Sequence, residues 1–346
     1  MRDLSGKKVM ILYTGGTIGM KKTPRGYAPV SDGLSEKIRA IDDLSLAGMP
    51  TWDFVSFSPL LDSADVAVDQ WNRIAGEIAA HYDDYDGFVV LHGTDTMAYT
   101  ASALSFMLEG LGKPVILTGA QIPLSEVRSD GRDNVIASVM IAAEGVANEV
   151  CLFFGGKLLR GNRATKMSAD RLVAFDSPNY PILARADIAI QYHTRNLRCD
   201  RRKKPIFHPF SRIPIAVWKI FPGIQFDLFT PMIGQTLSGV ILETFGTGNV
   251  PGVDGELLPL IKSAFRAGTV VTVCSQCPTG GVLLGAYQSG DALKKAGAVS
   301  GLDMTTEAAV TKLYALFSRG YTPAQVKERM GKNMAGELTA QKAVLP

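Results

Sequence analysis

The sequence has little of what marks a membrane, secreted or nucleic-acid-binding protein. Its 36 basic residues barely outnumber its 33 acidic ones, which leaves a net charge of +3 on 346 residues. A balance so close to neutral does not indicate nucleic acid or a membrane surface as a partner. No apolar run is long enough to cross a bilayer, and residues 1–8 lack the apolar stretch of a secretory signal. We therefore expect a cytoplasmic protein.

Cysteine and histidine are equally scarce, with four of each. The cysteines are few and irregularly spaced, so free thiols are expected rather than disulfides. Cys274 and Cys277 form a C-x-x-C pair, but no second ligand pair accompanies it and the histidines are scattered. A redox role for this pair remains a minor alternative. No metal and no cofactor are predicted.

What the sequence does contain is a regular alternation of apolar and amphipathic segments. Before residue 155, strands are predicted at residues 9–13, 54–57, 87–91, 114–118 and 150–154, and helices at 34–46, 68–82, 97–108 and 132–147. Alternation of this kind indicates an α/β fold with a mostly parallel sheet flanked by helices. A chain of this length suggests two domains rather than one.

Residues 196–212 interrupt the alternation because they are polar, basic and broken by prolines, which is typical of a linker. The charges of residues 201–204 are interpreted as solvated rather than as nucleic-acid contacts. Further strands are predicted at 215–220, 239–243 and 269–274, and helices at 256–267, 305–317 and 323–330. We therefore expect an N-terminal domain over 1–195, a linker over 196–212 and a smaller C-terminal α/β domain over 213–346.

The first predicted strand, residues 9–13, runs into Gly15 and Gly16, which are flanked by hydroxyls at Thr14 and Thr17. Loops at the carboxyl ends of strands are where open α/β sheets bind ligands. Paired glycines let the backbone turn sharply and let another group approach it. An ordinary tight turn and a phosphate cradle are the alternatives. The cradle is disfavoured because no Lys-Ser or Lys-Thr follows the glycines.

A second loop of this kind follows the strand at 87–91, where Gly93 precedes Thr94, Asp95 and Thr96. The helix predicted from residue 97 places Thr94 or Asp95 at a helix N-terminus, where unpaired N–H groups favour negative charge. A simple helix cap at Asp95 is the alternative. Since parallel strands end at one edge, this loop and the Gly15–Gly16 loop are expected to share an edge of the sheet.

A third stretch, residues 160–166, follows the strand at 150–154 and contains three cations, including Lys166. A lysine that is partly desolvated among other cations is driven toward its neutral form and can act as a base. A plain surface loop is the alternative. No histidine cluster suits a Ser-His-Asp arrangement, so Lys166 is the available partner for a weakly nucleophilic hydroxyl.

Thr14–Gly19 and His92–Thr96 together resemble the paired signatures of the bacterial-type L-asparaginases. The resemblance covers essentially the whole chain and is greatest with the cytoplasmic, type I branch. Further matching segments are Asp62-Ser63, Arg163–Lys166, Gly246–Asn249, Gly26-Tyr27, Leu91–Tyr99 and Met304–Ala309.

This resemblance implies hydrolysis of L-asparagine to L-aspartate and ammonia through a threonine acyl-enzyme, with a possible minor glutaminase activity. By motif, Thr17 resembles the nucleophile, and Tyr27 lies beside it on a mobile loop. Thr94, Asp95 and Lys166 match the second catalytic set, and backbone N–H groups near Thr94 are implied as the oxyanion site.

Asp62, Ser63, Thr94 and Asp95 match the positions that hold the substrate's α-carboxylate and α-ammonium. The family's sites lie at subunit interfaces, which implies that Asn249 completes the site of a neighbouring subunit. Family members assemble as homotetramers, each a pair of intimate dimers. The implied partners are thus L-asparagine and further copies of this chain.

One position departs from the pattern. Glu243 stands where type I relatives often carry an arginine, in the region where a regulatory asparagine can bind near Thr165 and Cys277. The reversed charge makes such regulation doubtful.

Two other functions stay open. One is the asparaginase-like subunit of the archaeal amidotransferase that acts on glutamate carried by tRNA. That subunit usually has an N-terminal extension, whereas the first strand here is expected by residue 9. The other is an amino-acid-binding regulatory protein without catalysis, which the presence of Thr17, Thr94, Asp95 and Lys166 disfavours.

Overall fold

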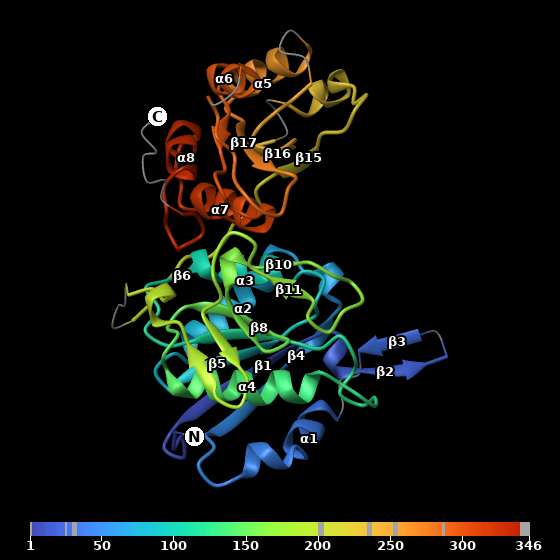
Figure 1. Cartoon of the computed structure of the whole chain (residues 1–346), viewed down its shortest axis with the longest axis vertical. Helices are drawn as coiled ribbons and strands as arrows, with labels where there is room; N and C mark the ends of the chain where they lie inside the picture. Colours follow the sequence, from blue (N-terminus) through green and yellow to red (C-terminus); the bar gives the residue numbers. More distant parts are fainter. Residues whose placement is uncertain are drawn as a thin grey trace. The chain divides into compact units, whose positions relative to one another are not determined.

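The structure is a computed structural model that describes residues 2–24, 26–29, 33–199, 204–233, 237–251, 255–285 and 288–339. The chain divides into two compact units, Met1–Phe207 and His208–Pro346, which are described separately here (Figure 1). Their boundary falls inside residues 196–212, where a linker is predicted. Residues 200–203 of that stretch, including most of its basic run, lie outside the described residues. Lys204, the last of the run, forms an ion pair with Asp83.

The first unit is built on an eight-stranded sheet with the order β13-β12-β9-β8-β7-β5-β1-β4. Strands β8, β7, β5, β1 and β4 are parallel, and β9, β12 and β13 extend the sheet by antiparallel pairing. The strands are Lys8–Gly15 (β1), Thr51–Leu61 (β4), Gly87–Leu91 (β5), Val115–Thr118 (β7), Val150–Phe154 (β8), Lys157–Arg160 (β9), Ala184–Ala186 (β12) and Ile190–Tyr192 (β13). The prediction of a mostly parallel sheet in an α/β fold is confirmed.

Helices cover both faces of this sheet, which is why β5, β7 and β8 are buried along their whole length. The helices are Leu34–Arg39 (α1), Val68–Ala80 (α2), Met97–Met107 (α3) and Gly131–Glu144 (α4). Residues of α1 and α4 share one hydrophobic cluster with β1 and β5, and α2 and α3 lie on the opposite face (Figure 1). Since β5, β7 and β8 follow in one direction across the sheet, one of the crossovers through α3 and α4 is left-handed, the rare hand.

The helix predicted over 34–46 is shorter than expected. It ends at Arg39, and Ile41 takes an extended conformation before a short 3-10 turn at Asp42–Ser45. Ile41 and Leu44 are both buried in the cluster beneath α1 and α4. The chain therefore leaves the helix after Arg39 and still buries both side chains in the same cluster as Leu34 and Ile38 of α1.

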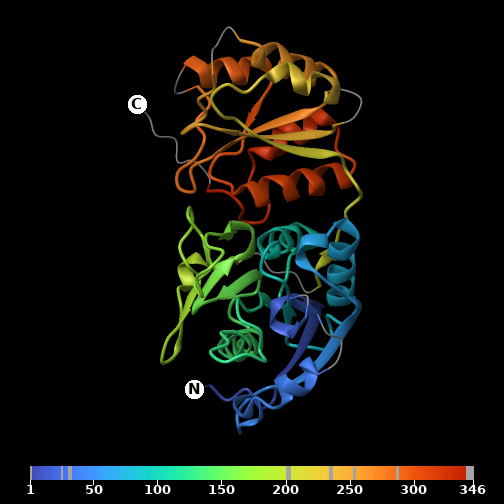
Figure 2. The ribbon, with the colours of Figure 1, turned by 90° about the vertical axis from the view of Figure 1, so that its right-hand side faces the viewer.

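The second unit contains a parallel sheet, β15-β16-β17-β18, with helices on both of its faces (Figure 2). Its elements are Ile215–Lys219 (β15), Gly239–Thr244 (β16), Leu257–Arg266 (α5), Val270–Ser275 (β17), Gln288–Ala296 (α6), Val299–Ser300 (β18), Thr306–Ser318 (α7) and Pro323–Met330 (α8). The short strand β18 and helix α6 are additions to the predicted elements. None of the helices in the described ranges of either unit has the length and apolarity needed to cross a membrane.

A buried ion pair anchors the end of the second unit. Lys312 on α7 lies 2.6 Å from the Glu337 carboxylate, and both side chains are fully buried. Lys312 also donates to the carbonyls of Met330 and Lys332, and Glu337 accepts from the backbone N–H of Ala335. These contacts hold the segment that follows α8 against α7.

Candidate active site

Three loops meet at the carboxyl ends of β1, β4 and β5. Gly16, at the end of β1, has a φ of 92°, and a Cβ placed on it would lie 2.3 Å from the Cα of Gly93. A Cβ on Gly93 would lie 2.5 Å from the Ser63 hydroxyl oxygen. Only glycine permits contacts this close. The prediction that the Gly15–Gly16 and Gly93 loops share one edge of the sheet is confirmed.

The two hydroxyls that flank the first glycine pair have different surroundings. Thr14 is buried, and its hydroxyl donates to the Leu91 carbonyl at 3.0 Å, which ties β1 to β5. Thr17 is only half-buried and begins the short 3-10 turn Thr17–Gly19. Thr14 therefore has a structural contact, whereas Thr17 retains access from solvent.

The second loop precedes helix α3 without capping it through Asp95. The cap residue is Thr96, and its hydroxyl donates to the Ser63 carbonyl at 2.7 Å instead of to the helix. Thr94 is buried to 5% exposure, whereas the Asp95 side chain is 68% exposed. The alternative interpretation of Asp95 as a plain helix cap is therefore wrong.

Lys166 reaches this loop from a segment that is distant in the chain. Its Nζ donates to Thr94 Oγ1 at 2.9 Å and to Asp95 Oδ1 at 2.6 Å. The amine thus joins a buried hydroxyl to an exposed carboxylate of the same loop. A hydroxyl held this close to an amine is an arrangement suited to proton transfer.

The path of the chain to Lys166 differs from the prediction. Residues 160–166 do not leave the carboxyl end of β8, because the hairpin strand β9 intervenes and runs antiparallel to β8. Arg160, at the end of β9, pairs with Cys151 near the amino end of β8. The turn Gly161–Arg163 then lies against α3, and the chain returns to the carboxyl edge as β10, Thr165–Lys166.

The other predicted site residues lie on separate elements. Asp62 follows β4, is exposed, and accepts from the backbone N–H of Ala64 at 3.0 Å. Tyr27 is 49% exposed on the hairpin of β2 (Met20–Thr23) and β3 (Gly26–Pro29), and β3 lies against the Thr17–Gly19 turn. Asn249 belongs to the second unit, just past β16, where its side-chain oxygen accepts from the Ser289 hydroxyl at 3.0 Å.

His92 also supports this site, which the sequence did not predict. The imidazole is fully buried, and burial lowers the pKa of His92 to about 4. Nδ1 donates to the Gly93 carbonyl at 2.7 Å, so Nε2 of the neutral ring accepts from the Thr100 hydroxyl at 3.0 Å. Thr100 in turn accepts from the Trp71 indole at 3.1 Å. This relay from α2 through α3 orients the Gly93 backbone, and the only sequence signal for it is a histidine at the end of an apolar strand.

Glu243, Cys274 and Cys277 all belong to the second unit. The Glu243 carboxylate accepts from the Thr306 hydroxyl at 2.5 Å. Cys274 is buried, and burial together with Glu243 raises the pKa of its thiol to about 12, while Cys277 is exposed and unbridged. Within the ranges that the structure describes, no three histidine, cysteine or carboxylate side chains lie close enough to hold a metal ion.

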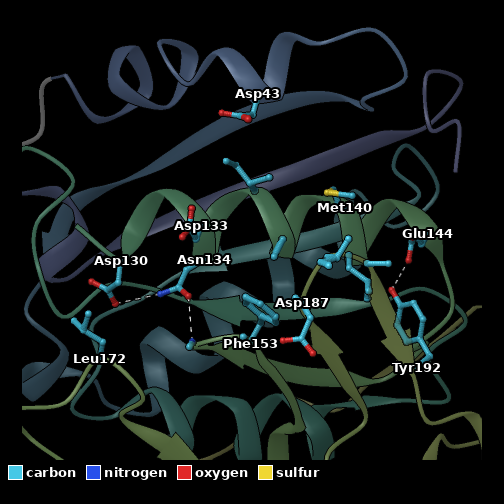
Figure 3. A pocket seen from close by; sticks show the side chains of 18 of the residues that line it. Asp43, Asp130, Asp133, Asn134, Met140, Glu144, Phe153, Leu172, Asp187 and Tyr192 are labelled. Carbon is cyan, nitrogen blue, oxygen red and sulfur yellow. Dashed lines mark hydrogen bonds between the residues drawn. The ribbon is translucent and has the colours of Figure 1, made fainter. Parts of the chain in front are cut away.

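A cavity of about 1060 Å³ opens beside α4, and Figure 3 shows the polar side chains that line it. These side chains bond to the protein itself. Asn134 bridges the Gly119 carbonyl and the Gly155 amide, the Asp130 carboxylate accepts from the Gln121 amide, and Glu144 accepts from the Tyr192 hydroxyl. None of the predicted site residues lines this cavity, and its Asp130 and Asn134 side chains support the loops after β7 and β8.

Fold and site together define an α/β protein whose reactive side chains lie on loops at the carboxyl edge of a mainly parallel sheet. Residues 8–198 match the family model "Asparaginase, N-terminal", and residues 214–330 match "Glutaminase/Asparaginase C-terminal domain". The chain therefore belongs to the asparaginase family.

Two solved structures and one curated relative illustrate this membership. The chain is 46% identical to L-asparaginase 1 of Escherichia coli K12 over 333 residues, which cover 96% of this chain and 98% of that protein. The structure of L-asparaginase I from Vibrio cholerae matches with a TM-score of 0.89 and 44% identity, covering 96% and 99% of the two chains. The thermostable L-asparaginase from Thermococcus kodakarensis matches with a TM-score of 0.88 and 30% identity, covering 96% and 100%.

Proposed function

We propose that the protein is an L-asparaginase, which hydrolyses L-asparagine to L-aspartate and ammonia. The observation that carries this proposal is the contact of Lys166 with Thr94 and Asp95, at a loop that touches the Gly15–Gly16 turn. The names of the similar full-length proteins point to the same reaction. These matches cover 96% of this chain and 98% and 99% of the two similar proteins, so the activity of the whole protein can be compared.

In the first half-reaction, the Thr17 hydroxyl attacks the side-chain carboxamide carbon of asparagine. The hydroxyl proton passes to the departing nitrogen, ammonia leaves, and an aspartyl ester remains on Thr17. Backbone N–H groups near Thr94 stabilise the oxyanion, since donors arranged in advance favour the charge that develops there. Tyr27, on the hairpin that lies against the Thr17–Gly19 turn, is the residue proposed to cover the reacting groups.

In the second half-reaction, a water molecule adds to the ester carbonyl. Thr94 and Lys166 accept the proton of this water, and the proton returns to the Thr17 oxygen as the ester bond breaks. The 2.9 Å separation of Nζ and Oγ1 is within direct proton-transfer reach.

Asp62, Ser63, Thr94 and Asp95 are proposed to hold the α-ammonium and α-carboxylate of the substrate. Carboxylates attract the ammonium, and hydroxyl and backbone N–H groups bond the carboxylate. Glutamine carries the same α-groups on a side chain one methylene longer, so a minor glutaminase activity is part of the proposal. The mechanism uses only side chains of this protein and needs no cofactor or metal.

We also propose that the active protein is a homo-oligomer of intimate dimers in the cytoplasm. The domain over 1–195 supplies the catalytic loops, and the domain over 213–346, joined to it by the linker over 196–212, supplies Asn249 to a neighbouring subunit's site. Regulation by a second asparagine at Glu243 is not part of the proposal. A carboxylate there, already bonded by Thr306, repels the carboxylate of such an effector.

Ammonia release from purified protein tests the function, with asparagine and glutamine compared at equal concentration. Turnover of asparagine with a clear preference over glutamine supports an asparaginase. Binding of asparagine by calorimetry without ammonia release would instead indicate an amino-acid-binding protein. Turnover that requires glutamyl-tRNA would indicate an amidotransferase subunit.

A further inference from the structure

We propose that Arg163 is a positioning residue for Lys166: its buried guanidinium fixes the turn that places the Lys166 amine against Thr94 and Asp95. Arg163 does not touch the reacting groups. The inference rests on the proposed catalytic role of Lys166 and extends it to a residue three positions earlier in the chain.

The strand that carries Lys166 is too short to hold its own register. Strand β10 pairs with β11 (Phe175–Asp176) at two positions, Thr165 with Asp176 and Lys166 with Phe175. A two-stranded ribbon of this length is unstable by itself. A slip of one residue would move Lys166 to the other face of the ribbon and away from Thr94. Contacts outside the ribbon must therefore fix its register.

Arg163 supplies such a contact just before β10. Only 1% of the residue is exposed, and its Nη2 donates to the Asn179 carbonyl at 2.8 Å. Its guanidinium carbon lies 5.1 Å from the centre of the Tyr180 ring. Asn179 and Tyr180 follow β11, so this one side chain links the segments before β10 and after β11. A planar guanidinium can bond a carbonyl and stack on a ring at once, which a lysine ammonium does less well.

Tyr180 is itself held firmly. Arg160 lies 4.4 Å from the same ring, and the Tyr180 hydroxyl donates to the Asn196 carbonyl at 3.0 Å. Arg160 forms an ion pair with Glu149 at 2.6 Å, in which both side chains are less than a tenth exposed. The ring on which Arg163 stacks is therefore part of a buried network tied to β8 and β9.

The turn that contains Arg163 is also fitted to the helix that follows the Thr94–Asp95 loop. A Cβ on Gly161 would lie 3.1 Å from the Ala101 carbonyl and 3.2 Å from the Ala101 methyl. Helix α3 thus sets both the start of the Lys166 segment and the position of Thr94. Gly161 packs against α3, and Arg163 contacts Asn179 and Tyr180. These contacts fix the position from which residues 164–166 continue.

The test is a double-mutant cycle between Arg163 and Lys166. Arg163→Met should lower kcat for asparagine by about tenfold to a hundredfold, the range expected when a catalytic group moves by about 1 Å, with KM changed by less than about threefold. Arg163→Lys should fall between Arg163→Met and the parent. Arg163→Met/Lys166→Ala should be no slower than Lys166→Ala alone, because a displaced amine and an absent one have the same effect.

The control is Ile78→Ala on α2, which truncates a fully buried side chain outside the β10–β11 ribbon and destabilises the same unit. Its kcat should match the parent below the unfolding temperature, and Ile78→Ala/Lys166→Ala should have the kcat of Lys166→Ala. The inference would be overturned if the losses of kcat from Arg163→Met and Lys166→Ala multiply in the double variant, or if Arg163→Lys keeps the parent's kcat. In both cases Lys166 would still be catalytic. A fully active Lys166→Ala enzyme would overturn the proposed mechanism and the inference with it. If Arg163→Met does not fold, the cycle with Arg163→Lys decides in the same way.

Discussion

The Nζ atom of Lys166 lies 2.9 Å from the hydroxyl oxygen of Thr94, although 72 positions separate the two residues in the chain. The same amine contacts Asp95 at 2.6 Å. An amine, a buried hydroxyl and a carboxylate are thus held together by two segments that have no local connection.

Replacing the proposed nucleophile should abolish turnover without loss of the fold. Thr17→Val substitutes a methyl for one hydroxyl on a half-buried side chain, and without that hydroxyl no ester can form. We expect a loss of at least about a thousandfold in kcat with little change in the free energy of unfolding. Steady-state ammonia release and denaturant unfolding measure the two quantities. Activity at about a tenth of the parent or more would show that Thr17 is not the nucleophile.

Thr94→Val should separate the two half-reactions. If Thr94 and Lys166 act mainly in deacylation, this variant should attack asparagine and stall as an acyl-enzyme. Intact-protein mass spectrometry after mixing with substrate should then show an added aspartyl group. The adduct should disappear in the Thr17→Val/Thr94→Val double variant. An inactive Thr94→Val enzyme without an adduct would instead assign Thr94 to acylation.

Mixing two inactive variants should restore activity if sites are shared between subunits. Thr17→Val and Asn249→Leu are unfolded and refolded together, and Asn249→Leu alone must first be shown by light scattering to assemble. In a mixed dimer, one of the two sites contains both intact residues. Random pairing then predicts about a quarter of the parent's activity. No recovery above the separate variants would place both residues in one protomer's site and reject the proposed role of the second domain.

The buried His92 should make stability depend on pH. Its pKa falls from 6.5 to about 4 in the folded protein because burial disfavours the imidazolium. Between these two values the unfolded chain binds a proton that the folded chain does not. The stabilisation is therefore complete above pH 6.5 and is lost as the pH falls toward 4, by about 3 kcal/mol in total.

Denaturant unfolding across that pH range measures this slope. His92→Gln, which cannot titrate, should show a shallower loss of stability on acidification than the parent. His193→Gln, at an exposed histidine, is the matched control and should retain the parent's slope. Parallel pH profiles for the parent and His92→Gln would contradict the assignment of a neutral, buried imidazole.

The Lys312–Glu337 pair should matter strongly for the second unit. Lys312→Met leaves the Glu337 carboxylate buried without its cation, which should cost about 3–5 kcal/mol in the unfolding transition of that unit. Lys312→Met/Glu337→Gln should recover part of this loss, because the uncompensated charge is gone. Chemical denaturation of the parent, of these two variants and of the Glu337→Gln single variant gives the coupling. A Lys312→Met protein as stable as its parent would show that the pair contributes nothing.

Much of the site could be predicted because its signals are local. Gly15 and Gly16 end an apolar run, Gly93 ends another, and parallel strands bring their carboxyl ends to one edge. That pattern predicts a shared edge, and the pairing of β1 with β5 in the structure brings Gly16 into contact with Gly93. By contrast, the helix ends at Arg39 although Ile41 and Leu44 keep helical spacing, and the His92 relay joins side chains of separate elements. Periodicity within one segment reports neither feature.

The sequence by itself determined the succession of strands and helices along the chain up to β8 and the residue types at each loop. Only the tertiary structure decided how Lys166 arrives. The chain reverses at Gly155 and Gly156 into β9, passes along α3 and returns through β10 to Thr94. This path depends on antiparallel pairing with β8, on the fit of Gly161 against α3 and on the stacking of Arg163 on Tyr180. Each of these contacts joins segments that are distant in the chain, so it stabilises the protein only once the fold has formed.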